Sequence, residues 1–199
     1  MSNTLKKRKG MSVLRESASL RRNVEKQNVM SFAMANVPKI MSDLKVAHDK
    51  WALGGSVAAI LYGCNIERCP HDIDVIVPMS IVDFVVSAIR NDFRYIHTPE
   101  RSSVDEELGM NHFAFRTANG PVIDIIGISD GLFKIHNYGG LFNIMTFEQL
   151  LKSKKQYNRQ KDIDDLVLMN ALYEEMNPEQ KQLGNIDALA KLKEKMQGK

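Results

Sequence analysis

Apolar residues recur along the chain at helical spacing in some segments and in short uninterrupted runs in others. Residues 11–35 contain neither Gly nor Pro, which favours a helix, although their apolar positions are only loosely periodic. Pro38 is well placed to open a second helix that continues to about Asp49. Helical spacing returns in three further segments. These predicted helices are residues 81–90, 147–157 and 161–176, the last with Ile163, Leu166, Val167, Met169 and Leu172 as its apolar positions.

Short apolar runs bounded by turn residues predict the strands. The clearest signal is a hairpin that joins residues 111–116 to residues 121–128 across Asn119-Gly120. Residues 99–108 and Gly139-Gly140 are predicted as loops. The remaining predicted strands are residues 51–53, 73–77 and 93–97.

This order of elements predicts an α/β chain of the α+β kind, in which a small mixed β-sheet is flanked by helices. We expect a basic helical arm over residues 1–36 and a core over residues 37–145. A C-terminal helical segment, residues 146–199, is expected to pack on the core.

Charge is distributed unevenly over the 199 residues, although 44% apolar and 26% charged residues are ordinary globular values. Residues 1–29 hold eight basic and two acidic residues, a net charge of +6, and the other 170 residues hold 19 basic and 22 acidic, a net charge of −3. No apolar run approaches the ~18 residues of a membrane span. We therefore expect a cytoplasmic protein with no membrane partner.

Cys64 and Cys69 are too few and too close to staple a fold of this size, so reduced thiols are expected. With His71 they form C-x4-C-x-H. This pattern lacks the second half of a zinc motif, and zinc is not predicted.

Two short motifs place polar groups at the ends of predicted strands. Gly54-Gly55-Ser56 forms a strand-to-helix turn, with Ser56 as the expected N-cap of a helix over residues 57–62. Backbone N–H groups in such a turn can hold a phosphate, although many of these turns bind nothing. Asp72 and Asp74 project to one face of their strand, because side chains alternate along it. Adjacent carboxylates repel unless a cation lies between them, so the pair predicts a Mg²⁺ site or two solvated acids.

Asp124 lies inside the apolar run 122–128, which predicts a strand covered on both faces. A charge in such a place needs a partner. A salt bridge with Arg68 or Arg116 would satisfy it structurally. A position beside Asp72 and Asp74 would instead complete a two-metal site for phosphoryl chemistry.

Taken in order, the Gly-Gly-Ser turn, the Asp-x-Asp strand and the lone Asp resemble the nucleotidyltransferase superfamily that includes DNA polymerase beta. The resemblance implies that Gly54, Gly55 and Ser56 bind a triphosphate. It also implies that the catalytic carboxylates Asp72, Asp74 and Asp124 bind Mg²⁺. Arg68 fits the family's stretch before the carboxylates, whereas Pro70 stands where many members have Ser or Thr.

A second match lies in Lys154-x4-Arg159-x-Lys161-Asp162-x2-Asp165. It is similar to a helix of small bacterial nucleotidyltransferases, including antibiotic-modifying enzymes and nucleotidyltransferase-like toxins. Lys161 and Asp165 are i, i+4 neighbours. Lys154, Arg159 and Lys161 could neutralise triphosphate oxygens, or the segment could be a solvated charged face.

The resemblance implies a nucleotidyltransferase core that uses Mg²⁺ in a two-metal site and an NTP as donor substrate. Such an enzyme moves an NMP to an acceptor and releases pyrophosphate. RNA, protein and small molecules all remain open as acceptors, because acceptor pockets come from variable loops. Two alternatives stand beside this function: a non-catalytic nucleotide- or partner-binding module on the same fold, and a nucleic-acid binder that uses the basic N-terminal arm.

Overall fold

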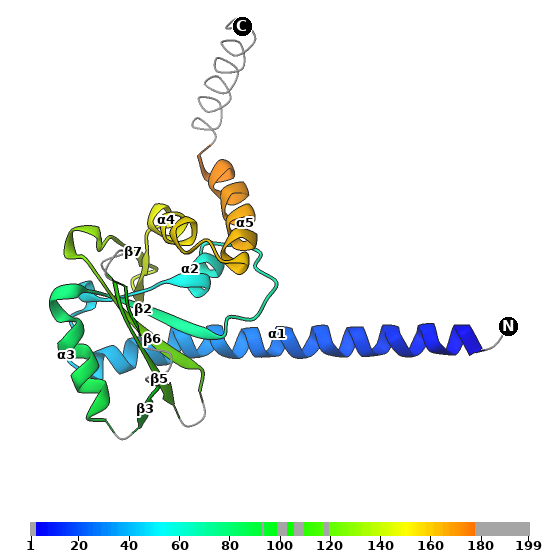
Figure 1. Cartoon of the computed structure of the whole chain (residues 1–199), viewed down its shortest axis with the longest axis horizontal. Coiled ribbons are helices and arrows are strands. Elements are labelled where there is room, and N and C mark those ends of the chain that lie inside the picture. The colour runs from blue at the N-terminus through cyan, green and yellow to red at the C-terminus, as the bar shows by residue number, and fades with distance from the viewer. Residues whose placement is uncertain (1–2, 93, 99–102, 106–109, 118–119, 178–199) are drawn as a thin grey trace, which may run out of the picture.

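The computed structural model describes residues 3–92, 94–98, 103–105, 110–117 and 120–177 (Figure 1). Phe93, Asn119 and parts of the predicted loop 99–108 lie outside the described residues. The helices are α1 (Asn3–Asp43), α2 (Gly55–Leu61), α3 (Met79–Arg90), α4 (Phe147–Tyr157) and α5 (Gln160–Met176). The strands are β1 (Ala52–Leu53), β2 (Asp72–Pro78), β3 (Tyr95–His97), β4 (Ser103–Asp105), β5 (Met110–Thr117), β6 (Val122–Ile128), β7 (Ile135–Tyr138) and β8 (Phe142–Met145).

The described strands form one mixed sheet in the order β3-β5-β6-β2-β1-β8-β7, with β4 paired to β5. β2 runs parallel to β6, and β1 runs parallel to β8, whereas the other pairs are antiparallel. The predicted α/β class with a mixed sheet is therefore confirmed, as is the β5–β6 hairpin.

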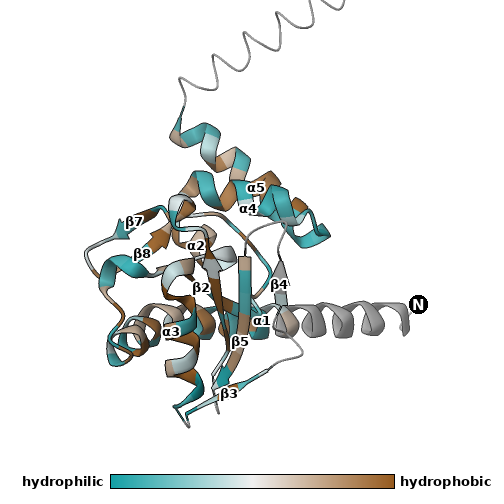
Figure 2. Cartoon of the chain, turned by 60° about the vertical axis from the view of Figure 1, so that its left-hand side comes forward, coloured by the Kyte–Doolittle hydropathy of each residue, from teal (hydrophilic) through white to brown (hydrophobic). Residues whose placement is uncertain are grey.

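The two faces of the sheet differ in what covers them. α1 and α3 pack against the face that carries Val75, Phe115 and Ile125, which are all at most 1% exposed. In Figure 2 hydrophobic residues gather on the central strands and on the parts of α3 beside them. α2, α4 and α5 lie toward the opposite face (Figure 1). Polar side chains on that face line the cavity described below. The candidate site thus lies on the face of the sheet opposite α1 and α3.

α1 is one continuous helix, so the predicted second helix beginning at Pro38 is wrong. Pro38 removes one backbone hydrogen bond, at a cost of about 3 kcal/mol in a helix interior. Ala33, Val37 and Met41 are buried on either side of it, and their packing holds the helix together across the proline. The helix ends at Asp43, before the left-handed Lys45 (φ 60°).

Three strands were not predicted. β7 and β8 form a hairpin around the predicted Gly139-Gly140 loop, and β4 lies inside the predicted loop 99–108. Each is only three or four residues long, which is too short for alternation to mark it as a strand. Within the described residues, no helix combines the length and apolar character needed to cross a membrane.

Candidate functional site

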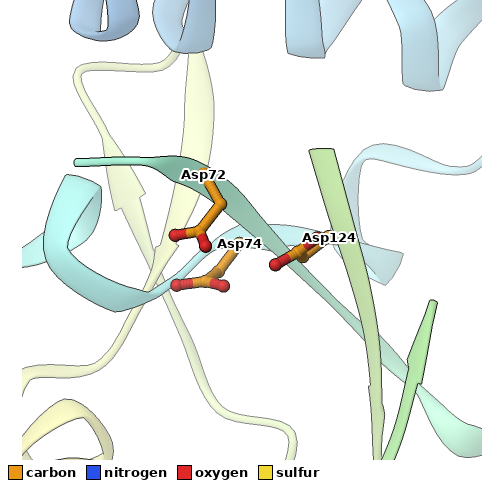
Figure 3. A group of neighbouring side chains, drawn as sticks. All are labelled: Asp72, Asp74 and Asp124. Atoms are coloured by element: carbon orange, nitrogen blue, oxygen red, sulfur yellow. The ribbon is translucent and has the colours of Figure 1, made fainter. Parts of the chain in front are cut away.

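Three carboxylates meet on the polar face of the sheet. β2 and β6 are parallel neighbours, and their register places Asp74 opposite Asp124. Asp72 lies two residues before Asp74 and therefore on the same face. One oxygen from each side chain lies within 4.8 Å of the others, and Figure 3 shows the three groups pointing toward one another. We call Asp72, Asp74 and Asp124 the carboxylate triad. Asp72 and Asp74 share a face as predicted, and of the two surroundings considered for Asp124, the structure shows the one beside these acids.

The triad concentrates negative charge on side chains that are partly or fully buried. Burial, together with the charges of Asp72 and Asp124, raises the pKa of Asp74 to about 7, against smaller opposing effects of Lys154 and His112. Asp124 is only 2% exposed. Such a group of like charges is most stable with a cation between its members.

His112 is a site residue that the sequence did not reveal. Its side chain projects from β5, and its Nε2 lies 3.0 Å from Oδ2 of Asp124. The hydrogen bond with Asp124 raises the pKa of His112. Asp124 is thus paired with a histidine, whereas Arg68, one of its two proposed partners, is bonded to Asp165. The alternation of β5 could have placed His112 on this face, but nothing in the sequence singled it out.

The Gly54-Gly55 turn lies directly against the triad. The N–H of Gly54 donates to the backbone carbonyl of Asp74 at 2.8 Å. Gly55 has φ +55°, and a Cβ atom there would lie 1.6 Å from Oδ2 of Asp74. Only glycine fits this position, so the close approach of turn and carboxylate depends on the missing side chain.

Ser56 is not the N-cap of the following helix, because α2 begins at Gly55 with Gly54 as its cap. The Ser56 hydroxyl instead takes part in long-range contacts. It accepts a hydrogen bond from Nη2 of Arg68 at 2.6 Å and donates one to Oδ2 of Asp165 at 3.3 Å. Nζ of Lys154 is a further donor at 3.4 Å. Arg68 therefore contacts Ser56 rather than lining the cavity described below.

Three buried charged residues join α4 to α5. Nζ of Lys154 lies 2.9 Å from Asp162 and 2.7 Å from Asp165, and all three side chains are at most 6% exposed. We call Lys154, Asp162 and Asp165 the α4–α5 cluster. Burial raises the pKa of Asp162, but hydrogen bonds from Arg159 and Lys154 outweigh it and lower the pKa overall. In the described part of the chain, Asp165 pairs with Lys154 and Arg68, and its i−4 neighbour Lys161 forms no ion pair with it.

A cavity of about 780 Å³ brings most of the predicted site residues together. Among the wall residues that the sequence did not single out are one histidine and two lysines, His112, Lys134 and Lys152. Gly54 is buried below the turn, where an added Cβ would meet Ile76 at 2.7 Å. The predicted residues in the wall are Gly55, Ser56, Asp72, Asp74, Asp124, Lys154, Arg159 and Lys161.

The carboxylate triad fits a divalent metal ion. Its ligand atoms are hard oxygens within 4.8 Å of one another, which is the chemistry that Mg²⁺ prefers. The raised pKa of Asp74 reflects its burial first and then repulsion by Asp72 and Asp124, which a cation would relieve. The glycine at position 55 leaves room for the Asp74 carboxylate beside the turn.

Comparison by sequence finds no matching protein-family profile and no matching curated protein. Solved structures do share the fold. A lincomycin-bound lincosamide antibiotic adenylyltransferase matches with a TM-score of 0.51 and 16% identity, over 73% of this chain and 99% of that one. The Megavirus polyadenylate synthase matches with a TM-score of 0.49 and 10% identity. The match covers 88% of this chain but only 43% of the synthase chain. The first match carries the assignment, and the resemblance inferred from the motifs is confirmed for the fold.

Proposed function

Since the chain has the nucleotidyltransferase fold, we propose that it is a Mg²⁺-dependent nucleotidyltransferase that moves an NMP from an NTP to an acceptor and releases pyrophosphate. The observation that carries the proposal is the carboxylate triad beside the Gly55 turn, at the wall of a cavity. A fold of this kind hosts other functions, so the proposal depends on the site rather than on the fold.

The triad is proposed to hold Mg²⁺ in a two-metal site, which supplies charge neutralisation and polarisation of the phosphoryl oxygens when it is bound. Asp72 and Asp74 would hold the ion that faces the phosphates. Asp124 would complete the second site or accept the proton of the acceptor. Its hydrogen bond from His112 fixes the orientation of that carboxylate.

The cations in the cavity wall divide into two kinds. Lys154 is neutralised by Asp162 and Asp165, and Arg159 contacts Asp162 at 2.6 Å. In the described part of the chain, the ammonium group of Lys161 has no ion-pair partner. We therefore propose that Lys161 neutralises the triphosphate directly, while Lys154 and Arg159 contribute from positions fixed by the cluster. Gly55 and Ser56 would form the wall against which the triphosphate lies.

Transfer of label from the α-phosphate tests this function. Each of the four α-labelled NTPs is incubated with the protein, Mg²⁺ and a host lysate, and the label is followed into RNA, protein and small-molecule fractions. We expect label in one of these fractions with the wild-type chain. Asp72→Asn and Asp74→Asn should abolish it, because each removes a proposed metal ligand.

Asp83→Asn is the matched control, since Asp83 is an exposed acid on α3. Transfer that survives in the Asp72 and Asp74 variants contradicts the proposal. Mg²⁺-dependent NTP binding by calorimetry, without transfer to any fraction, would identify the non-catalytic binding module instead.

A further inference from the structure

Asp165 links three separate parts of the chain through one oxygen atom. Its Oδ2 accepts hydrogen bonds from Nη2 of Arg68, from Nζ of Lys154 at 2.7 Å and from the hydroxyl of Ser56 at 3.3 Å. These donors come from the segment before β2, from α4 and from the start of α2. Asp165 itself is 2% exposed and belongs to α5. A carboxylate in this position fixes the three donors relative to one another.

The hydrogen-bonding capacity of the Ser56 hydroxyl is used within the protein. A serine hydroxyl has one proton to donate and two lone pairs that accept. The geometry directs the proton to Asp165 and the lone pairs to Arg68 and Lys154. The hydroxyl therefore acts as a connection between the cavity wall and α5.

We propose that Asp165 is a positioning residue, which holds Ser56 and Lys154 at the cavity wall and thereby sets the affinity for the triphosphate part of the nucleotide. This inference rests on the proposed function, because it requires a nucleotide in the cavity. It adds that the affected part of the ligand is the polyphosphate, since Ser56 and Lys154 are the cavity residues that Asp165 contacts.

Asp162, the other carboxylate of the α4–α5 cluster, has different hydrogen-bond partners. Its hydrogen-bond partners in the described part of the chain are Lys154 and Arg159. Asp165 is the member that also contacts Ser56. The two acids thus share Lys154, but the link to the Gly55-Ser56 turn belongs to Asp165.

The test compares the binding of ATP and AMP, each with Mg²⁺, by titration calorimetry of the full chain. If another base is the preferred donor in the labelling experiment, its triphosphate and monophosphate are used. Loss of a hydrogen bond to a charged group is worth roughly tenfold or more in affinity. We expect Asp165→Asn to weaken triphosphate binding by about that factor and to change monophosphate binding less than about threefold.

Asp164→Asn is the matched control, because Asp164 is the exposed neighbour on the same helix. Its triphosphate affinity should equal that of the wild type. An Asp165→Asn protein that binds triphosphate as tightly as the wild type, or that loses both ligands equally, overturns the inference. A wild-type chain that binds no NTP contradicts the proposed function itself, and the inference falls with it.

A double-mutant cycle with Ser56→Ala separates positioning from an independent effect. If Asp165 acts through Ser56, the double variant should lose about as much triphosphate affinity as the more damaging single variant. If the fold-loss of the double variant equals the product of the two single fold-losses, the two residues act independently and the inference is overturned. If Asp165→Asn does not fold, Ser56→Ala alone decides the matter: it must lose triphosphate and keep monophosphate affinity, and an unchanged triphosphate affinity overturns the proposal.

Discussion

Two groups of charged side chains lie at the same cavity, and they are balanced in different ways. The carboxylate triad brings together three acids, with His112 as the ion-pair partner of Asp124. The α4–α5 cluster places one lysine between two acids, and Arg68 and Arg159 add further positive charge at its edges. The cluster is compensated by the protein itself, whereas the triad is compensated only in part.

This difference separates a ligand site from an architectural one. A buried charge that is paired inside the protein links the elements that carry the pair and needs no counter-ion from solution. A group of like charges that remains unbalanced keeps an affinity for a counter-ion. The triad is therefore the place where a cation is expected. The cluster has a structural role, because its ion pairs hold α4 against α5; we call this its frame role.

The largest effect is expected at the cluster, from Lys154→Met. The substitution leaves Asp162 and Asp165 buried beside each other without their shared cation. Removing one partner of a buried ion pair costs about 3–5 kcal/mol. Urea unfolding should show this loss in the free energy of unfolding. Lys155→Met, at the exposed neighbouring position on α4, should change it by less than about 0.5 kcal/mol, and an equal loss in both variants would contradict the frame role.

At the triad, Asp74→Asn is expected to raise the free energy of unfolding of the metal-free protein, whereas Lys154→Met lowers it. The folded-state pKa of about 7 lies above the ordinary aspartate value of 3.8, so the folded protein binds more protons than the unfolded chain between these pH values. The contribution of Asp74 to the free energy of unfolding is therefore fully present below about pH 4 and is lost as the pH rises through 7. The neutral amide removes this loss, and we expect it to raise the free energy of unfolding at pH 8 by roughly 1–4 kcal/mol.

The measurement is urea unfolding at pH 4 and pH 8 in the presence of a chelator. Mg²⁺ added at pH 8 should stabilise the wild type and leave Asp74→Asn unchanged, because a ligand stabilises only the state that binds it. Asp83→Asn serves again as the surface control. A wild-type stability that is flat between these pH values would show that the triad carries no unbalanced charge.

A smaller effect is expected from His112→Gln. This substitution tests whether the contact with His112 orients the Asp124 carboxylate for metal binding. Loss of a residue that orients a metal ligand lowers metal affinity by about 10-fold or more. Titration of Mg²⁺ should show this loss, while His136→Gln on the exposed side of β7 should show none. Since the folded-state pKa of His112 is raised, its stabilisation is present below its unfolded-state pKa and is lost as the pH rises through the folded value.

The sequence predicted the triad better than it predicted the cluster, and the reason is periodicity. Strand alternation is a strict rule, so Asp72 and Asp74 had to share a face, and the apolar run around Asp124 placed it in a central strand. Which strand lies beside which is a property of the whole sheet. The parallel pairing that sets Asp74 opposite Asp124 became visible only in the structure.

Long-range contacts between irregular segments were beyond sequence reasoning. Pairing of Arg68 with Asp165 spans 97 positions along the chain, and no local pattern encodes it. The role expected of Ser56 as an N-cap followed a local propensity, but tertiary hydrogen bonds decide where its hydroxyl points. The same holds for Pro38, where buried neighbours outweigh the local preference of proline to begin a helix.

The smallest effect is expected on α5, where burial is the reverse of what hydropathy predicts. Val167 is 67% and Ile163 41% exposed, whereas Asp162 and Asp165 are almost fully buried. The helix turns its acids inward because Lys154 and Arg68 lie there, and Met169 is its buried apolar residue. Val167→Ser should therefore change the free energy of unfolding by less than about 0.5 kcal/mol. Met169→Ala should cost about 2–5 kcal/mol in the same urea titration, and equal losses would mean that hydropathy, not the α4–α5 cluster, orients the helix.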